Sequence, residues 1–438
     1  AMYEALGSMG LSSGNVLEPS CGVGNFMGLV PDSMDNLRMY GVELDSISGR
    51  IARQLYQKNE IAVQGFEETE FPDSFFDCVI GNVPFGETGV SDKRYDKHHF
   101  LIHDYFITKT LDKVRLLRRE AHNRFGELTL RGAEQHQGIA RRMYERFPEV
   151  FKGDVHVDAK STVVIRCILS MENALQELLR HNNRLRISHD ASNHDMHYMN
   201  FWDAELQKKC LPERSKGDYE AFRARHEKHD RVMRSLFNDE DYWQKEINAA
   251  DLNYRLFKLA SNIQSSEARH SITLYNLFTA DELYENWLQT NAWWYTHYGA
   301  YTGNDANMSF VERFLLKKMI DEADSCLLQK RPGATLRYGH EVCVLPLACL
   351  MELDNYGLAT DNLEQLDKMG WRCYDIFPMA CNVQMVFYRH KNAKKDTLVK
   401  VLLSENEARL PLTPVTGNYY RWVDVRKYYL DKLAAFAL

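Results

Sequence analysis

The segment ATLRYGHEVCVLPLACLMEL (Ala334–Leu353) joins a short strand-like stretch to a run of apolar residues. The pattern predicts a strand that ends at Gly339-His340-Glu341, followed by a buried helix. One interpretation of the His-Glu pair is structural: a helix N-cap with a carboxylate that stabilises the helix dipole. The other is catalytic, and the flanking sequence bears on the choice.

Similar units of strand and helix occur upstream and downstream. Val157–Arg180 predicts a strand, a Ser-Thr turn, Arg166, and a helix. Residues 126–151 predict a Leu-Thr-x-x-Gly turn that leads into an amphipathic helix. Residues 398–433 predict two strands and a final helix. By itself, an arginine in a turn is usually solvated or ion-paired, so the order of these units is the stronger signal.

That order resembles the histidine acid phosphatases, in the branch of the phytases and multiple inositol polyphosphate phosphatases, over about residues 114–438. The resemblance implies that Arg166 is a phosphate-pocket arginine, His340 a pocket histidine and Glu341 the proton donor. Such a pocket needs guanidinium and imidazole donors for the phosphate oxygens and an acid to protonate the leaving group. The implied ligand is a phosphomonoester such as an inositol phosphate, with no cofactor for this domain.

The nucleophile of that family is missing from this sequence. The resemblance implies a histidine in an Arg-His-Gly-x-Arg motif on a first strand, and Arg-His-Gly occurs nowhere in the chain. Arg269-His270 is the nearest match in the middle of the chain, but Ser271 follows in place of glycine. We therefore expect phosphatase activity to be absent or severely impaired.

The first part of the chain carries a different pattern. Asn15–Phe26 (NVLEPSCGVGNF) predicts a strand, a Gly-containing turn and a helix, an arrangement suited to a nucleotide-type cofactor. A second predicted strand ends in Glu43, an acid placed to bind ribose hydroxyls, and a helix follows from about Ser46. A third strand ends near Glu67, and a fourth, Asp77–Gly86, ends in Asn-x-Pro-Phe.

These elements resemble the class I S-adenosylmethionine-dependent adenine-N6 DNA methyltransferases over residues 12–113. The resemblance implies S-adenosylmethionine as the cofactor, a ribose contact from Glu43, and binding of a flipped base by the Asn-x-Pro-Phe residues. Val83 departs from the family pattern, which has proline there. The implied catalytic residues are Asn82, Pro84 and Phe85, and the implied cofactor loop comprises Glu18, Pro19, Cys21, Gly22, Gly24 and Phe26.

The sequence predicts neither the DNA-binding region nor the later strands of that family. After about residue 114 the sequence becomes charged and helical, RLLRREAHNRFG, where the family has a Pro-Gly-Gly turn and a fifth strand. Residues 1–113 hold 17 acidic and 9 basic side chains, against 44 and 45 in the remainder. Because DNA affinity depends on phosphate neutralisation, DNA binding is not expected from this chain alone.

The predicted fold class is α/β: a partial Rossmann-like methyltransferase half over 1–113, followed by a histidine-phosphatase-like α/β domain with an inserted helical cap. The phosphatase-like core covers 114–189 and 331–438 and lacks its first strand, and the helical, aromatic cap covers 190–330. Within the cap, His194, Asp195 and His197 lie close in sequence, but a hydrogen-bonded surface turn is preferred to a metal site. Trp293, Trp294 and Tyr295 are expected in the core.

Composition limits the location and chemistry. Hydrophobic residues make up 45% and charged residues 26%, as in soluble globular proteins. No apolar run reaches about 18 residues and no signal peptide is visible, so a cytoplasmic protein without a membrane span is expected. Exported relatives are common in the phosphatase family. The nine cysteines contain no C-x-x-C pair, which disfavours a disulfide framework and a structural zinc site.

Three functional hypotheses follow. The first is an impaired phosphomonoester-binding protein of histidine acid phosphatase descent. The second is an S-adenosylmethionine-binding methyltransferase fragment with a C-terminal interaction module. The third is a non-functional chimera of the two.

Overall fold

The computed structural model describes residues 2–8, 11–72, 75–84, 89–98, 102, 105, 109, 126–200, 202–210, 213–237, 240–266, 269, 273–329, 331–390 and 396–436. The chain divides into two compact units, Ala1–Phe125 with Leu259–Leu274, and Gly126–Lys258 with Tyr275–Leu438. The predicted boundary between residues 113 and 114 lies outside the described residues, and the other predicted domain limits stay predictions.

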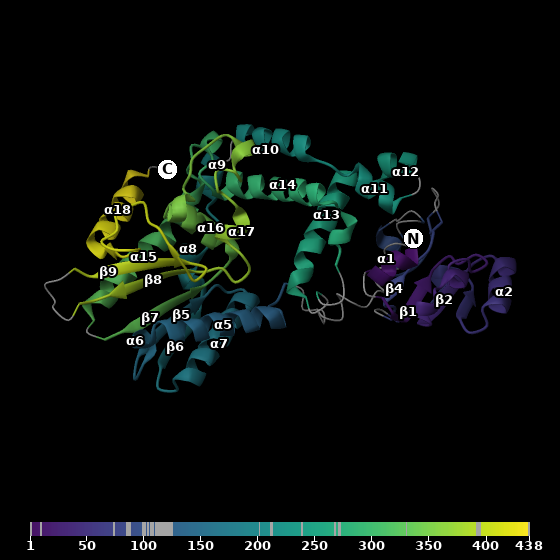
Figure 1. Ribbon diagram of the computed structural model, residues 1–438, viewed down its shortest axis with the longest axis horizontal. Helices are drawn as coiled ribbons and strands as arrows, with labels where there is room; N and C mark the ends of the chain where they lie inside the picture. The colour runs from purple at the N-terminus through teal and green to yellow at the C-terminus, as the bar shows by residue number, and fades with distance from the viewer. Residues whose placement is uncertain are drawn as a thin grey trace. The chain divides into compact units, whose positions relative to one another are not determined.

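The first unit contains a four-stranded parallel sheet in the order β3-β2-β1-β4. Val16 and Leu17 of β1 are fully buried because they lie at the centre of this sheet. The prediction of a second strand that ends in Glu43, followed by a helix at Ser46, is confirmed. The elements are α1 (Met2–Ser8), β1 (Ser13–Glu18), β2 (Asn36–Glu43), α2 (Ser46–Leu55), β3 (Glu60–Val63) and β4 (Cys78–Val79) (Figure 1).

The helix expected after the glycine loop does not form. Two short 3₁₀ turns, Met27–Leu29 and Asp32–Met34, lie between the loop and β2 instead. Two causes act against an α-helix here: Gly28 has a low helix propensity, and Pro31 has no N–H to donate. The loop therefore does not present a long helix N-terminus to a ligand.

The second unit contains a three-stranded parallel sheet in the order β6-β5-β7. Helices α5 and α7 pack on one face of this sheet, where Val157 and Ala159 of β5 are fully buried (Figure 1). The predicted turn into an amphipathic helix is confirmed by α5, and the structure adds that the Thr129 side chain caps this helix by accepting a hydrogen bond from Gly132 N at 3.1 Å. The elements are α5 (Leu130–Arg146), α6 (Pro148–Phe151), β5 (His156–Ser161), α7 (Ile165–His181), β6 (Arg186–Ala191) and β7 (Gly333–Tyr338).

A second, antiparallel sheet in the same unit is built around β9, which pairs with β8, β10 and β11. The sequence predicted two strands before the final helix, and β8 was not among them. Helix α18 covers this sheet with Trp422, Val425 and Tyr429, all buried. The elements are α16 (Glu341–Leu350), α17 (Cys373–Ile376), β8 (Val383–Tyr388), β9 (Leu398–Leu403), β10 (Asn406–Ala408), β11 (Tyr420–Arg421) and α18 (Trp422–Ala435).

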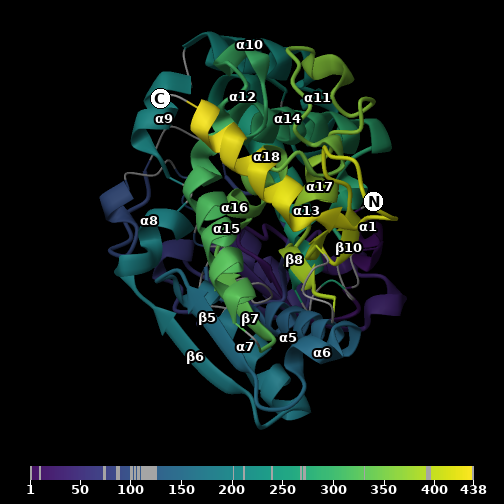
Figure 2. The same ribbon diagram turned by 90° about the vertical axis from the view of Figure 1, so that its left-hand side faces the viewer.

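The region between β6 and β7 is helical, as predicted (Figure 2). Tyr295 is fully buried and Trp293 and Trp294 pack against the same core, which confirms their expected role. No helix in the described part of the chain is long and apolar enough to cross a membrane. The helices are α8 (Met196–Met199), α9 (Ala204–Cys210), α10 (Glu213–His226), α11 (Asp230–Leu236), α12 (Glu240–Glu246), α13 (Ala249–Asn262), α14 (Ala280–Tyr298) and α15 (Arg313–Leu328).

Candidate functional site

His340 lies between the end of β7 and the start of α16. It occupies the N-cap position of α16 in an extended conformation, and its side chain does not cap the helix. Helix α16 is anchored by Leu345, Leu347 and Leu350, all of which are buried. The apolar run of the sequence thus places the His340 backbone at a defined point on the carboxyl edge of the parallel sheet. This outcome confirms the strand-to-helix prediction for this segment.

Arg166 reaches the same point from the neighbouring strand. Ser161, at the end of β5, pairs with Tyr338, at the end of β7, so the loops that follow both strands lie side by side. Arg166 lies in the first turn of α7, and its Nη2 donates to His340 Nδ1 at 3.3 Å. Its Nη1 donates to the Gly126 carbonyl at 3.3 Å. The fold therefore brings together two predicted site residues that are 174 positions apart.

Two further residues that the sequence did not single out line this site. Thr162 is fully buried, and its Oγ1 lies 3.5 Å from His340 Nε2. The Cys167 thiol donates to the Gly339 carbonyl at 3.2 Å and lies 3.8 Å from His340 Nδ1. Their only sequence signal was their position, directly after a strand for Thr162 and next to Arg166 for Cys167.

The electrostatics of the site favour a neutral imidazole. Burial, and then the adjacent Arg166 charge, lower the pKa of His340, while Glu341 acts in the opposite direction. The Arg166 guanidinium can only donate, so His340 Nδ1 accepts and Nε2 carries the proton. Burial raises the pKa of the Cys167 thiol, which keeps it protonated. Glu341 is exposed beside these residues, in the first turn of α16.

This arrangement is suited to an anion. The first turns of α7 and α16 both lie at the carboxyl edge of the sheet, and helix N-termini favour negative charge. Arg166 adds a permanent positive charge, and the His340 Nε2–H and the Thr162 hydroxyl add neutral donors. A phosphate or sulfate group matches this combination of charge and donors.

The methyltransferase-like residues gather at the carboxyl edge of the other sheet. Glu43, at the end of β2, accepts hydrogen bonds from Gly22 N at 2.7 Å and Asp45 N at 2.8 Å. Glu18, at the end of β1, is 2% exposed, and its Oε2 has no hydrogen-bond partner among the described residues. Burial, and then the Glu43 charge, raise the pKa of Glu18 to about 8. The two carboxyl groups thus flank the glycine loop from adjacent strands.

The rest of the predicted loop packs around these acids. Pro19 and Cys21 are buried, and the Phe26 carbonyl accepts a hydrogen bond from the Tyr3 hydroxyl at 2.6 Å. Gly22 and Gly24 both have a positive φ, of 54° and 84°. These conformations explain why glycine occupies both positions.

Asn82 and Pro84 follow β4, and Phe85 lies outside the described residues. A Cβ on Gly81 would lie 3.5 Å from Pro19 and 3.6 Å from Glu18, so the segment that leads to Asn82 passes beside the end of β1. The strand order changes direction between β1 and β4, and ligands of open α/β sheets bind at such a switch point.

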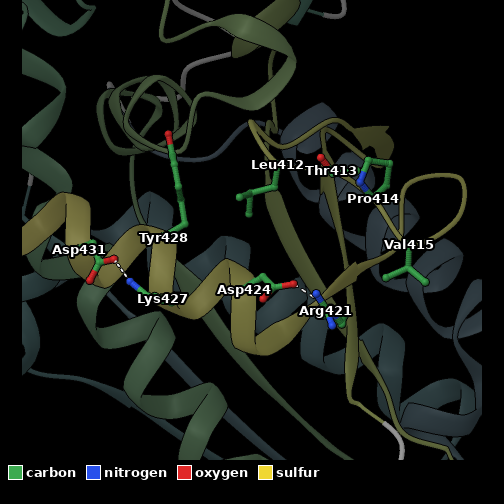
Figure 3. A pocket seen from close by; sticks show the side chains of 9 residues that line it. All are labelled: Leu412, Thr413, Pro414, Val415, Arg421, Asp424, Lys427, Tyr428 and Asp431. Atoms are coloured by element: carbon green, nitrogen blue, oxygen red, sulfur yellow. Dashed lines mark hydrogen bonds and ion pairs between the residues drawn. The ribbon is translucent and has the colours of Figure 1, made fainter.

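Two cavities lie away from both sets of residues. One, of about 660 Å³, is open and lies beside α18 (Figure 3). Its charged residues form the ion pairs Arg421–Asp424 and Lys427–Asp431, which leaves little for a charged ligand. The other, of about 370 Å³, lies between α5 and residues 378–382 and 404–405.

The side chains with metal-ligand spacing have other partners. Asp195 is buried and accepts hydrogen bonds from Lys160 Nζ at 3.0 Å and from the Tyr198 hydroxyl at 3.1 Å. The turn is therefore hydrogen-bonded, as predicted, but its central carboxylate is not on the surface. Within the described ranges, no group of three or more His, Cys, Asp or Glu side chains is arranged to hold a metal ion. All nine cysteines are free in this structure.

Solved structures share this fold. The multiple inositol polyphosphate phosphatase of Bifidobacterium longum, in its complex with inositol hexasulfate, is 17% identical, with a TM-score of 0.59 over 70% of this chain and 79% of that chain. The phytase from D. castellii is 11% identical, with a TM-score of 0.51 over 69% of this chain and 64% of that chain. At these identities the likeness shows the fold and not the ligand.

Relatives by sequence match shorter segments. The type II methyltransferase M.CvrRI of Paramecium bursaria Chlorella virus XZ-6E is 39% identical over 84 residues, which are 19% of this chain and 21% of that protein. The "Defense against restriction protein B" of Escherichia phage P1 is 34% identical over 119 residues, 26% of this chain and 5% of that protein. The chain thus spans 21% or less of the length of these relatives.

The family assignment rests on a longer match. Residues 103–404 match the histidine phosphatase superfamily (branch 2), and this range is more than half of the chain. It contains β5, α7, β7 and α16, which carry Arg166 and His340. The α/β fold class predicted from the sequence is confirmed. The chain belongs to the histidine phosphatase superfamily, branch 2.

Proposed function

We propose that the second unit binds phosphomonoesters of the inositol phosphate class at the site formed by Arg166 and His340. The observation that carries the proposal is the 3.3 Å approach of Arg166 Nη2 to His340 Nδ1 at the start of two helices. An arriving phosphate dianion would take the Arg166 donor, which frees His340 to protonate and contribute a second charge-assisted hydrogen bond. The B. longum phosphatase, which was solved with phosphate as well, supports this class of ligand.

We propose further that hydrolysis is absent or severely impaired. Covalent catalysis needs a nucleophile that can attack phosphorus, and the Arg-His-Gly-x-Arg motif expected from the resemblance does not occur in the sequence. Among the site residues described, Cys167 is no replacement, because burial raises the pKa of its thiol and leaves little thiolate. Glu341 retains the chemistry of a proton donor, but protonation of the leaving group contributes little without attack.

Isothermal titration of the full chain with myo-inositol hexakisphosphate tests the binding proposal. Arg166→Ala and His340→Ala should each weaken binding by roughly tenfold to a hundredfold, the value of a charge-assisted hydrogen bond. Arg180→Ala is the matched control, since Arg180 lies on the same helix but pairs with Glu177. Equal affinity in all four proteins would exclude this site.

Turnover is measured separately with p-nitrophenyl phosphate. We expect no release of p-nitrophenol above that of the His340→Ala protein. If the wild type does turn over substrate, and Arg166→Ala and His340→Ala do not, the proposal of impaired hydrolysis is wrong. The proposed location of the site would then still hold. The two parts of the proposal can therefore fail independently.

As a second candidate function, we infer that the first unit binds S-adenosylmethionine. The buried Glu18 Oε2, without a partner among the described residues, supports this, since buried polar atoms of folded proteins almost always have one. A ligand with amino and hydroxyl groups would supply donors to Glu18 and Glu43 across the glycine loop. DNA is not part of this proposal, because the unit is acidic.

Titration of the full chain with S-adenosylmethionine tests the second candidate. Glu18→Gln and Glu43→Gln should lose the heat of binding, and Glu70→Gln, an exposed acid of the same unit, should retain it. Absence of heat with the wild-type chain, at concentrations where phytate binding is measured, would end this candidate. A DNA oligonucleotide titrated in parallel should give no heat.

A further inference from the structure

Strand β7 has one paired edge and one open edge. Tyr338 O accepts from Thr162 N at 3.0 Å, so the backbone groups of Tyr338 point toward β5. Because successive residues of a strand alternate, those of Leu336 and Ala334 also point toward β5, and those of Thr335 and Arg337 point the other way. The outward N–H groups of Thr335 and Arg337 make no hydrogen bond within the described part of the chain.

Strand β8 has an open edge of the same kind. Ser404 N donates to Asn382 O at 2.7 Å, so the backbone groups of Asn382 point toward β9. The backbone groups of every second residue after it, beginning with Gln384, point the same way. The backbone groups of Val383, Met385 and Phe387 therefore point away from β9. No hydrogen bond of these three groups is found among the described residues either.

The two open edges lie next to each other in the same unit. Beyond the end of β8, Arg389 Nη2 donates to Gln329 O at 2.8 Å, in the segment that precedes β7. Both views show β8 beside β7 (Figures 1 and 2).

Helix α5 joins the two sheets from one side. The ring of His136 lies 6.1 Å from that of Tyr338 on β7, and Arg142 Nε donates to Glu405 Oε1, beyond the end of β9, at 3.0 Å. The cavity of about 370 Å³ lies between this helix and the turns that flank β8 and β9. The two strand edges are thus held over a common helix without pairing with each other.

Each of these two edge strands packs one apolar row of side chains against a hydrophobic core, while its other row includes polar side chains such as Thr335 and Arg337 of β7 and Gln384 of β8. Val383, Met385 and Phe387 pack against one core, while Leu336 and Tyr338 pack against the other. All six residues of β8 are half-buried. A strand placed between β7 and β8 would therefore be covered on both faces, and strands of that kind are apolar throughout.

We propose that the open edges of β7 and β8 together receive an extended segment of another polypeptide, apolar on both faces, as an inserted strand. Only an extended backbone offers donors and acceptors to both edges at once, as in other cases of strand addition. Each edge strand has six residues, which sets the length of the segment. Whichever way the segment runs, one of its ends lies near His340, because β7 ends there. The docking does not require the proposed function.

The probe is a fluorescein-labelled synthetic peptide with alternating valine and isoleucine over six positions, flanked by lysines for solubility. Fluorescence anisotropy with the full chain should show saturable binding. Thr335→Pro removes an outward N–H without removing a bond to β5, and it should weaken binding by at least about tenfold. Thr335→Val, which keeps the N–H, should bind as the wild type does.

A second edge and a second measurement guard against misfolding. Met385→Pro should weaken binding in the same way on the β8 edge, with Met385→Leu as its control, and circular dichroism checks that the variants fold. Hydrogen exchange should slow at Thr335, Arg337, Val383, Met385 and Phe387 when the peptide is added. Unchanged binding in both folded proline variants, or no binding by the wild-type chain, would overturn the proposal.

Other occupants of the slot would appear in the same experiments. If these five amides are already protected without peptide at every protein concentration, another part of this chain fills the slot. If their protection and the molecular mass rise with protein concentration, a second copy fills it. Either result would overturn the proposal of a separate partner.

Discussion

At the scale of single residues, the imidazole of His340 depends on its arginine neighbour. The Arg166 charge contributes to the lowered pKa of His340, after burial. Replacing Arg166 by Gln should therefore raise the pKa of His340 in a histidine-ring NMR titration, with the resonance assigned by His340→Asn. Arg180→Gln should leave it unchanged. An unmoved pKa in Arg166→Gln would mean that the two side chains are not neighbours in solution.

The same shift predicts how stability changes with pH. A histidine whose folded pKa lies below its unfolded value stabilises the fold above the unfolded value, about 6.5. This contribution is lost as the pH falls through the folded pKa, because protonation then favours the unfolded chain. The His340→Asn variant should lack this part of the acid destabilisation.

Glu18 should act with the opposite sign in the first unit. Its pKa is raised to about 8, so its neutral form is favoured in the fold. Its contribution to stability is present below the unfolded value and is lost as the pH rises through about 8. Urea denaturation of the wild type should show that the free energy of unfolding declines as the pH rises from about 5 to 8. This decline should be absent in Glu18→Gln and still present in Glu70→Gln. A pH-independent wild type would contradict the burial of this carboxyl.

At the scale of elements, the glycine loop after β1 allows a matched comparison. Gly22 and Gly24 both have a positive φ. A Cβ added at Gly24 would lie 2.5 Å from the Tyr56 ring, whereas a Cβ added at Gly22 would have no neighbouring atom within 4 Å. Gly22→Ala should therefore cost only the backbone strain, roughly 1–2 kcal/mol. Gly24→Ala should cost more, as measured by urea denaturation. Equal losses would show that the loop relaxes around Tyr56.

Elements also show where sequence patterns succeed and where they fail. The turn into α5 and the buried helix α16 were predicted, because turn residues and apolar patterns act over a few neighbouring residues. Strand β8 was missed, since its register depends on β9, whose paired residues run from Leu398, opposite Tyr388, to Leu403, opposite Val383. The helix after the glycine loop was wrongly predicted, because Gly28 and Pro31 outweigh the family pattern.

At the scale of the whole molecule, the chain holds separate hydrophobic cores in its two units. Differential scanning calorimetry should resolve two unfolding transitions. Phytate at a hundredfold excess over its Kd should stabilise only the second unit, by about 2.7 kcal/mol. A single transition shifted by both phytate and S-adenosylmethionine would contradict independent units. A broad, non-cooperative melt without ligand effects would favour the non-functional chimera.

The sequence by itself determined the α/β class, the helical insertion and the elements that carry Arg166, His340 and Glu43, because local patterns of burial and capping decide these. The absence of Arg-His-Gly is also a property of the sequence alone. Only the tertiary structure decided that Arg166 meets His340, since this follows from the pairing of β5 with β7. The tertiary structure also placed Thr162 and Cys167 in the site and left β7 and β8 with open edges. Strand pairing and packing decide both outcomes, and they bring together residues that lie far apart in the sequence.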